Sequence, residues 1–217
     1  MKDSATDLTL YGYWRSSASW RARWALELKQ IAYRYIPVSL LNGENKAPAH
    51  LARNPMGAVP VLEVGGKYLS ESLAIIQWLE ETFPDTTRLF PTEAWPRAQV
   101  RALCEIINSA IAPLQAPRAQ KIHSDDPVAR EKFAVHFIRE GLKVYEGLAA
   151  PLRGQWSVGN HITAADLFLI PQIYNAVRYK IPVENEFPAL WKMYLAALNT
   201  EACAKASPER QIDAPKS

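Results

Sequence analysis

Three serines lie close together near the N-terminus of the chain, at a junction between two local patterns. Ser16, Ser17 and Ser19 occur where a strand-like run at residues 8–14 gives way to a helical run at residues 20–30. The first N–H groups of a helix have no partner within it, and together with the helix dipole they attract an anion. A serine hydroxyl at this point can donate a further hydrogen bond to that anion, or it can simply cap the helix.

A thiolate is one anion that such a junction stabilises, because this setting lowers the pKa of a thiol from its usual value of about 8.5. The junction has Ala18 between its serines and no cysteine. Cys104 and Cys203 lie far along the chain, in helical patterns and without the spacing of a metal site. We therefore expect Ser16 and Ser17 to bind a thiolate that a ligand brings, and the sequence does not choose between them.

Two other segments offer groups that suit the remainder of such a ligand. Val59-Pro60 begins a short strand, and a proline there can be cis, which turns backbone groups outward to pair with an extended peptide. Ser72 begins a second predicted helix, where its hydroxyl and N–H suit a carboxylate, and Glu71 suits an ammonium group. A ligand with a thiol, a peptide stretch and an amino-acid end fits all three segments, and glutathione is such a molecule.

The elements that must position these residues alternate between strand and helix, as in an α/β fold. The pattern predicts strands at residues 8–14, 33–40, 59–64 and 67–69, and helices at residues 20–30, 49–53 and 73–82. Gly65-Gly66 predicts a tight hairpin turn between the last two strands. We therefore predict an α/β domain over residues 7–84.

The rest of the chain has an all-α pattern. Prolines interrupt the chain around residues 85–96, which we interpret as a linker. The segments that follow predict helices at residues 95–111 and 126–150, from residue 163 onward, and at residues 188–198, within an all-helical domain over residues 97–217. Thr163 and Asp166 have the spacing of a capping box. The polar tail after Ser207 is predicted to be frayed.

Composition sets limits on the function. The net charge of +3 is too small for a nucleic-acid-binding or polybasic membrane surface. No apolar run approaches the roughly 20 residues of a membrane span, and the N-terminus lacks the apolar region of a signal peptide. With two cysteines in helical patterns, we expect a reducing, cytoplasmic setting. The four histidines show no paired spacing, so we assign no metal.

The chain resembles the zeta-class glutathione transferases, the class that includes the maleylacetoacetate isomerases. The run RSSASWRAR at residues 15–23 resembles the zeta signature Ser-Ser-Cys-Ser-Trp-Arg-Val-Arg, with Ala18 in place of the cysteine. Further segments match in order and spacing: residues 54–55 with 59–60, 71–75, 113–115, 159–166, and 171–172 with 175–176 and 178. The resemblance covers residues 8–198.

This resemblance implies a thioredoxin-like N-terminal domain followed by an all-helical C-terminal domain, in a homodimer that uses glutathione. The expected glutathione contacts are Ser16, Ser17, His50, Val59, Pro60, Glu71, Ser72 and Gln115. His50 stands beside Leu51, which replaces a glutamine that often makes this contact in the family. We call the segment that carries Ser16 and Ser17 the serine loop. Arg15, at its rim, and Arg178, which matches a zeta arginine, are candidates to bind carboxylates of the substrate. Arg21 and Arg23 are expected in salt bridges.

The activity implied is the cis–trans isomerisation of maleylacetoacetate, a step of aromatic amino-acid catabolism. A glutathione thiolate adds to the cis double bond, the resulting single bond rotates, and elimination leaves the trans isomer. Maleylpyruvate isomerases and transferases acting on α-haloacids use the same scaffold and remain alternatives. A non-catalytic binding module is a further alternative, against which the intact serine loop argues.

Overall fold

The computed structural model describes residues 7–216, and these fold into two compact units. One unit comprises the residues up to Arg88 together with those from Asn199 onward, and the other comprises Leu89–Leu198. The sequence pattern placed residues 97–217 in a single helical domain. The structure differs, because the C-terminal segment returns to the first unit and packs there.

The first unit is built on a four-stranded sheet with strand order β2-β1-β3-β4. Its strands are β1 (Leu8–Gly12), β2 (Arg34–Pro37), β3 (Val61–Val64) and β4 (Lys67–Ser70). β1 pairs parallel with β2 and antiparallel with β3, and β3 and β4 form the predicted hairpin. Gly65 and Gly66 both have positive φ in its turn, as a tight hairpin connection requires. This mixed sheet with its crossover helix confirms the thioredoxin-like class.

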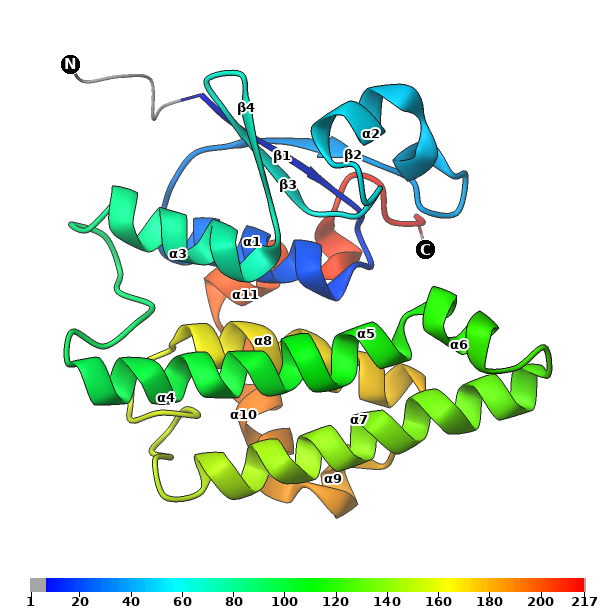
Figure 1. Ribbon diagram of the computed structural model, residues 1–217. Helices are drawn as coiled ribbons and strands as arrows, with labels where there is room; N and C mark the ends of the chain where they lie inside the picture. Colours follow the sequence, from blue (N-terminus) through cyan, green and yellow to red (C-terminus); the bar gives the residue numbers. More distant parts are fainter. Residues whose placement is uncertain (1–6, 217) are drawn as a thin grey trace. The chain divides into compact units, whose positions relative to one another are not determined.

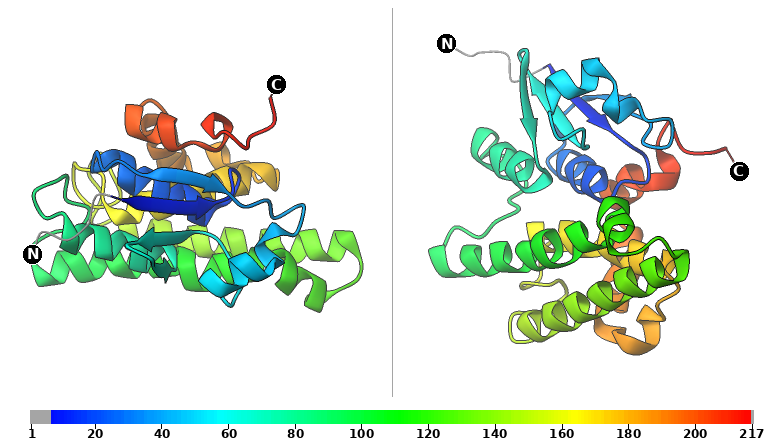
Figure 2. Two further views of the ribbon diagram at one scale, coloured as in Figure 1. Left: turned by 90° about the horizontal axis from the view of Figure 1, so that it is seen from above. Right: turned by 45° about the vertical axis from the view of Figure 1, so that its right-hand side comes forward.

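Helices cover both faces of this sheet. α1 (Ser17–Leu28) and α3 (Ser72–Thr82) pack against each other on one face, and α2 (Pro48–Arg53) lies on the opposite side (Figures 1 and 2). The short η1 (Glu44–Lys46) precedes α2, and α11 (Glu201–Ala206) and η3 (Pro208–Arg210) end the unit. α11 packs against α1. Because α1 has the sheet and α3 on one side and α11 on another, all its residues from Ser19 to Leu26 are buried.

The second unit is all-helical. It comprises α4 (Ala94–Glu105), the π-helical η2 (Ile106–Ile111), α5 (Ala112–Gln115), α6 (Pro117–His123), α7 (Pro127–Ala149), α8 (Ala164–Arg178), α9 (Val183–Glu186) and α10 (Pro188–Leu198). The helix predicted at residues 95–111 therefore continues through a π-helical turn into α5. Pro113 explains the wide turn. It has no backbone N–H to donate to the carbonyl four residues earlier, and its ring clashes with that carbonyl.

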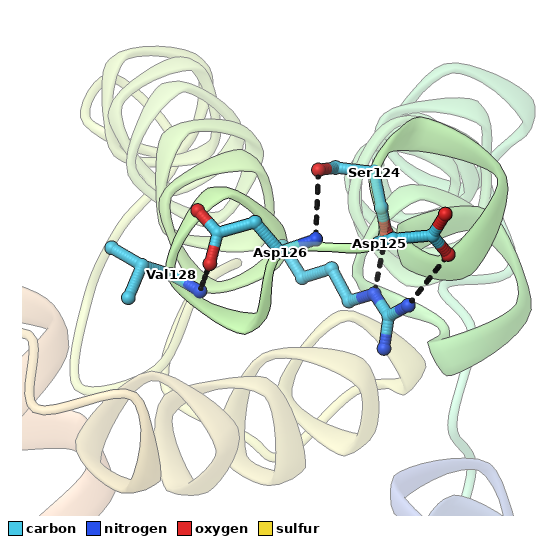
Figure 3. A network of polar contacts seen from close by, with 5 residues as sticks. Ser124, Asp125, Asp126 and Val128 are labelled. Atoms are coloured by element: carbon cyan, nitrogen blue, oxygen red, sulfur yellow. Dashed lines mark hydrogen bonds and ion pairs between the residues drawn. The ribbon is translucent and has the colours of Figure 1, made fainter.

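Two aspartates cap the long helices of this unit. At the start of α7, the carboxylate of Asp126 accepts from Val128 N at 3.1 Å, and Ser124 Oγ accepts from Asp126 N (Figure 3). The same carboxylate accepts from Ala129 N at 3.2 Å. At the start of α8, Asp166 and Thr163 form the predicted capping box. None of the helices within residues 7–216 is long and apolar enough to cross a membrane.

Candidate functional site

The two candidate serines lie at the N-terminus of α1 and have different environments. Ser16 is the N-cap residue, and its Oγ accepts from Ser19 N at 3.2 Å. Ser17 is the first residue of the helix, and within residues 7–216 its hydroxyl has no hydrogen-bond partner. Both side chains are half-buried. Ser16 thus performs the capping role while its O–H stays able to donate, and Ser17 has its whole hydroxyl available.

The loop that precedes these serines is held by its own backbone and by Ser19. Ser16 N donates to Tyr13 O at 3.0 Å, and Tyr13 N donates to Ser19 Oγ at 3.3 Å. Ser19 is fully buried and therefore has a structural role. Arg15 is half-buried, and its guanidinium lies 5.4 Å from the centroid of the Trp14 ring. Its charged end is therefore at the rim of the loop, where the sequence placed it.

The arginines of α1 are buried, which the sequence did not predict. Arg21 Nη1 lies 3.3 Å from Ser72 Oγ, and so joins the start of α1 to the start of α3. Arg23 donates to the carbonyl oxygens of Tyr13, Trp14 and Ala206 instead of forming the expected salt bridge. A buried guanidinium needs such hydrogen bonds, because leaving its donors unmet costs a large desolvation free energy.

The peptide between Val59 and Pro60 is cis, in agreement with the expectation from the sequence. The loop before this peptide is fixed by two side chains, one from His50 of α2 and one from Asn54, which directly follows α2. His50 Nε2 and Asn54 Nδ2 approach Ala58 O at 3.0 and 3.1 Å. The Nε2 atom must carry a proton to donate to this carbonyl, and the His50 Nδ1 atom is buried without a hydrogen-bond partner. His50 therefore supports the loop directly, and a contact with glutathione stays a prediction.

Glu71 and Ser72 mark the start of α3. Glu71 has φ 69° and ψ 115°, a conformation that non-glycine residues rarely adopt and that clusters at functional sites. Its side chain is exposed, whereas Ser72 is buried and receives the Arg21 hydrogen bond. The backbone here turns the Glu71 carboxylate outward while Ser72 stays fixed at the helix N-terminus. No pattern of residue types in the sequence signals this backbone geometry.

The remaining candidates belong to the helical unit. Gln115 at the end of α5 and Gln172 of α8 form a buried reciprocal amide pair, with N–O distances of 2.9 and 3.0 Å. Arg178 at the end of α8 is exposed, and its Nη1 lies 3.5 Å from Asn175 Oδ1. Gln115 therefore has a structural partner, and Arg178 has its guanidinium largely in solvent. Their roles toward a ligand stay predictions.

Neither cysteine offers a thiol to this site. Cys104 and Cys203 are free and buried, and burial raises the pKa of the Cys203 thiol to about 12. A thiolate at the serine loop must therefore come from a ligand, as the sequence indicated.

Residues 6–81 match the family model for the glutathione S-transferase N-terminal domain. The maleylacetoacetate isomerase of Rhizobium meliloti is 41% identical over 95% of this chain and 98% of its own length. The chain belongs to the zeta-class glutathione transferases. A maleylpyruvate isomerase from a Ralstonia species is 36% identical over 95% of this chain and 99% of its own length.

Solved zeta-class structures have the same fold as this zeta-class chain. The holo structure of a bacterial maleylpyruvate isomerase superimposes with a TM-score of 0.90 and 36% identity, covering 95% of this chain and all of that one. The maleylacetoacetate isomerase of Anaeromyxobacter dehalogenans, with glutathione bound in its active site, gives a TM-score of 0.87 and 42% identity. That match covers 96% of this chain and 98% of the other.

Proposed function

We propose that this protein is a glutathione-dependent cis–trans isomerase of the maleylacetoacetate type. The observation that carries the proposal is the serine loop at the start of α1, which offers hydroxyl and helix N-terminal donors to a thiolate while both cysteines of the chain are buried. Relatives named maleylacetoacetate isomerase or probable maleylacetoacetate isomerase, from a bacterium, Dictyostelium discoideum and animals, support the same activity at 36–41% identity over 94% of the chain or more.

The donor set of the first unit fits glutathione chemically. The Ser17 hydroxyl and the N-terminal N–H groups of α1 suit its thiolate, and the backbone beside Val59 and Pro60 suits its peptide portion. Glu71, exposed at the start of α3, suits its ammonium group, and Ser72 suits its carboxylate. His50 completes the proposed set in this unit through the loop that it supports, and Gln115 of the helical unit is the remaining proposed contact.

When bound, glutathione supplies the thiolate that adds reversibly to the cis double bond of the substrate. The chain's part is to keep that sulfur ionised and aligned. Ser17 donates to the sulfur through a hydroxyl with no competing partner among residues 7–216. Ser16 caps the N-terminus of α1 by accepting from Ser19 N. Such preorganised donors stabilise charge without reorganising during the reaction. Arg15 and Arg178 are proposed to bind the carboxylates of the substrate.

Maleylpyruvate is the second candidate substrate. It is supported by the Ralstonia maleylpyruvate isomerase, which is 36% identical, and by the maleylpyruvate isomerase structure with a TM-score of 0.90. Both compounds are cis diketo acids with anionic ends, so the same thiolate and arginines would serve either. The α-haloacid transferase and the non-catalytic module have no comparable support.

The test is an assay of purified protein with maleylacetone or maleylpyruvate, with and without glutathione. We expect a glutathione-dependent loss of the absorbance of the cis isomer for at least one compound, and the larger kcat/KM names the substrate class. No glutathione-dependent loss for either compound would reject the isomerase proposal.

We also propose that the protein is a cytoplasmic homodimer with residues 7–84 as its glutathione-binding domain. Membership of the zeta class supports the dimer, and two free, buried cysteines suit a reducing compartment. Light scattering coupled to gel filtration is expected to give twice the chain mass of 24.4 kDa. A mass of one chain at micromolar concentration would reject the dimer.

A further inference from the structure

The C-terminal segment is tied to the loop that carries the proposed thiolate-binding serines. Asp213 Oδ2 accepts from Trp14 N at 2.9 Å, and Trp14 lies two residues before Ser16. Arg23 Nε donates to Ala206 O, at the end of α11, at 2.9 Å. We call Arg23, Asp213 and the Ala206 carbonyl the C-terminal clasp. All three belong to the first compact unit. The C-terminal segment of the chain is coloured red in Figure 1.

Arg23 is the centre of the C-terminal clasp. It is fully buried, and its guanidinium donates to Trp14 O at 3.0 Å and to Tyr13 O at 3.4 Å as well as to Ala206 O. Its guanidinium carbon also lies 5.6 Å from the centroid of the Tyr35 ring on β2. One buried cation therefore joins the serine loop, α11 and the sheet.

The clasp accounts for the backbone polar groups of the serine loop. Trp14 is held at its N–H by Asp213 and at its carbonyl by Arg23. Tyr13 is held at its N–H by Ser19 Oγ, and its carbonyl accepts from Arg23 and from Ser16 N. Without Asp213, the Trp14 N–H loses its hydrogen-bond partner, and the loop between β1 and α1 loses the contact that fixes its outer end.

We propose that the C-terminal clasp positions the serine loop for thiolate binding, with Asp213 and Arg23 as positioning residues that do not touch glutathione. The inference rests on the proposed function for its catalytic consequence. Its structural part stands on the Trp14 and Arg23 contacts alone. A loop displaced by about 1 Å can lower a rate a hundredfold, so a single distant hydrogen bond is sufficient to affect turnover.

The test compares Asp213→Ala with Asp213→Asn, which keeps an oxygen to accept from Trp14 N. Ile212→Ala is the matched control, because that neighbouring side chain is 77% exposed. The measurements are hydrogen exchange at the Trp14 amide, affinity for glutathione, and kcat and KM. We expect Asp213→Ala to raise the Trp14 exchange rate and to lower kcat about tenfold, with a smaller change in KM for the second substrate. Asp213→Asn is expected to recover most of both losses.

Unchanged exchange at Trp14 in Asp213→Ala would overturn the clasp, and so would faster exchange with unchanged kcat. Equal losses in Asp213→Asn and Asp213→Ala would also contradict it, because the acceptor oxygen would then not matter. If the wild-type protein isomerises neither substrate, the proposed function fails. Hydrogen exchange at the Trp14 amide and the affinity for glutathione then still test the C-terminal clasp. Faster Trp14 exchange with weaker glutathione binding in Asp213→Ala would support it, and no change in either would reject it.

Discussion

Asp166 should contribute several kcal/mol to stability, because it is a fully buried capping residue whose carboxylate accepts several hydrogen bonds. Its carboxylate accepts from Ser157 N at 2.9 Å, from Thr163 N at 2.8 Å and from Thr163 Oγ1 at 3.1 Å. Asp166→Ala leaves two backbone N–H groups buried without partners. Each such group costs about 1–3 kcal/mol, and the Thr163 hydroxyl can turn to another acceptor. The expected loss in the free energy of unfolding is therefore about 2–6 kcal/mol for the two groups together.

Asp126 is the matched control for this prediction. Its carboxylate also accepts from two backbone N–H groups at a helix start, but Asp126 is exposed, so water replaces the lost acceptor. Asp126→Ala should cost only about 1 kcal/mol. Urea unfolding followed by circular dichroism measures the free energy of unfolding of both variants. In thermal unfolding, Asp166→Ala should lower the Tm by roughly 4–24 °C. Equal losses for the two variants would refute the argument that burial makes the difference.

Buried groups should also determine the pH dependence of stability, the reactivity of the thiols and the affinity for glutathione. Burial raises the pKa of Asp166 above its ordinary value of 3.8, so the stability due to its protonated form is complete below about pH 4 and is lost as pH rises through the raised pKa. The unfolding free energy of the wild type relative to Asp166→Asn should therefore fall from pH 4 to pH 7 in urea titrations, and a constant difference would contradict this. Burial raises the pKa of Cys203 to about 12, and Cys104 is also buried. Both thiols should therefore react with a thiol reagent at pH 8 only after denaturation. Rapid labelling of the native protein would contradict this. Arg21→Met removes the donor to Ser72 Oγ and should weaken glutathione binding about two- to tenfold by calorimetry, whereas unchanged affinity would separate Arg21 from the site.

The sequence predicted those elements whose signals are local. The strand pattern of β1, the Gly65-Gly66 hairpin and the Asp126 and Thr163 caps were all confirmed, because alternation, turn residues and caps depend on neighbours in the chain. The resemblance to the zeta class was confirmed as well. Each of these signals needs only a short window of sequence or a set of matched spacings.

The features that the sequence missed depend on residues far apart in the chain. Arg23 was expected in a salt bridge, but it is buried and the return of α11 gives it the Ala206 carbonyl as a partner. The tail after Ser207 looked frayed because its residues are polar, yet Asp213 accepts a hydrogen bond from Trp14 N, 199 positions earlier in the chain. The positive φ of Glu71 has no marker in the residue type either. Such tertiary contacts override local propensity.

The central claim is that the serine loop stabilises a thiolate that glutathione brings. The direct measurement is a titration of the glutathione thiol on the protein, followed by thiolate absorbance, in the wild type, Ser17→Ala and Ser16→Ala. We predict that the bound thiol titrates below the usual value of about 8.5, and that Ser17→Ala shifts it back toward that value more than Ser16→Ala does. A bound thiol that titrates like free glutathione in the wild-type protein would contradict the claim.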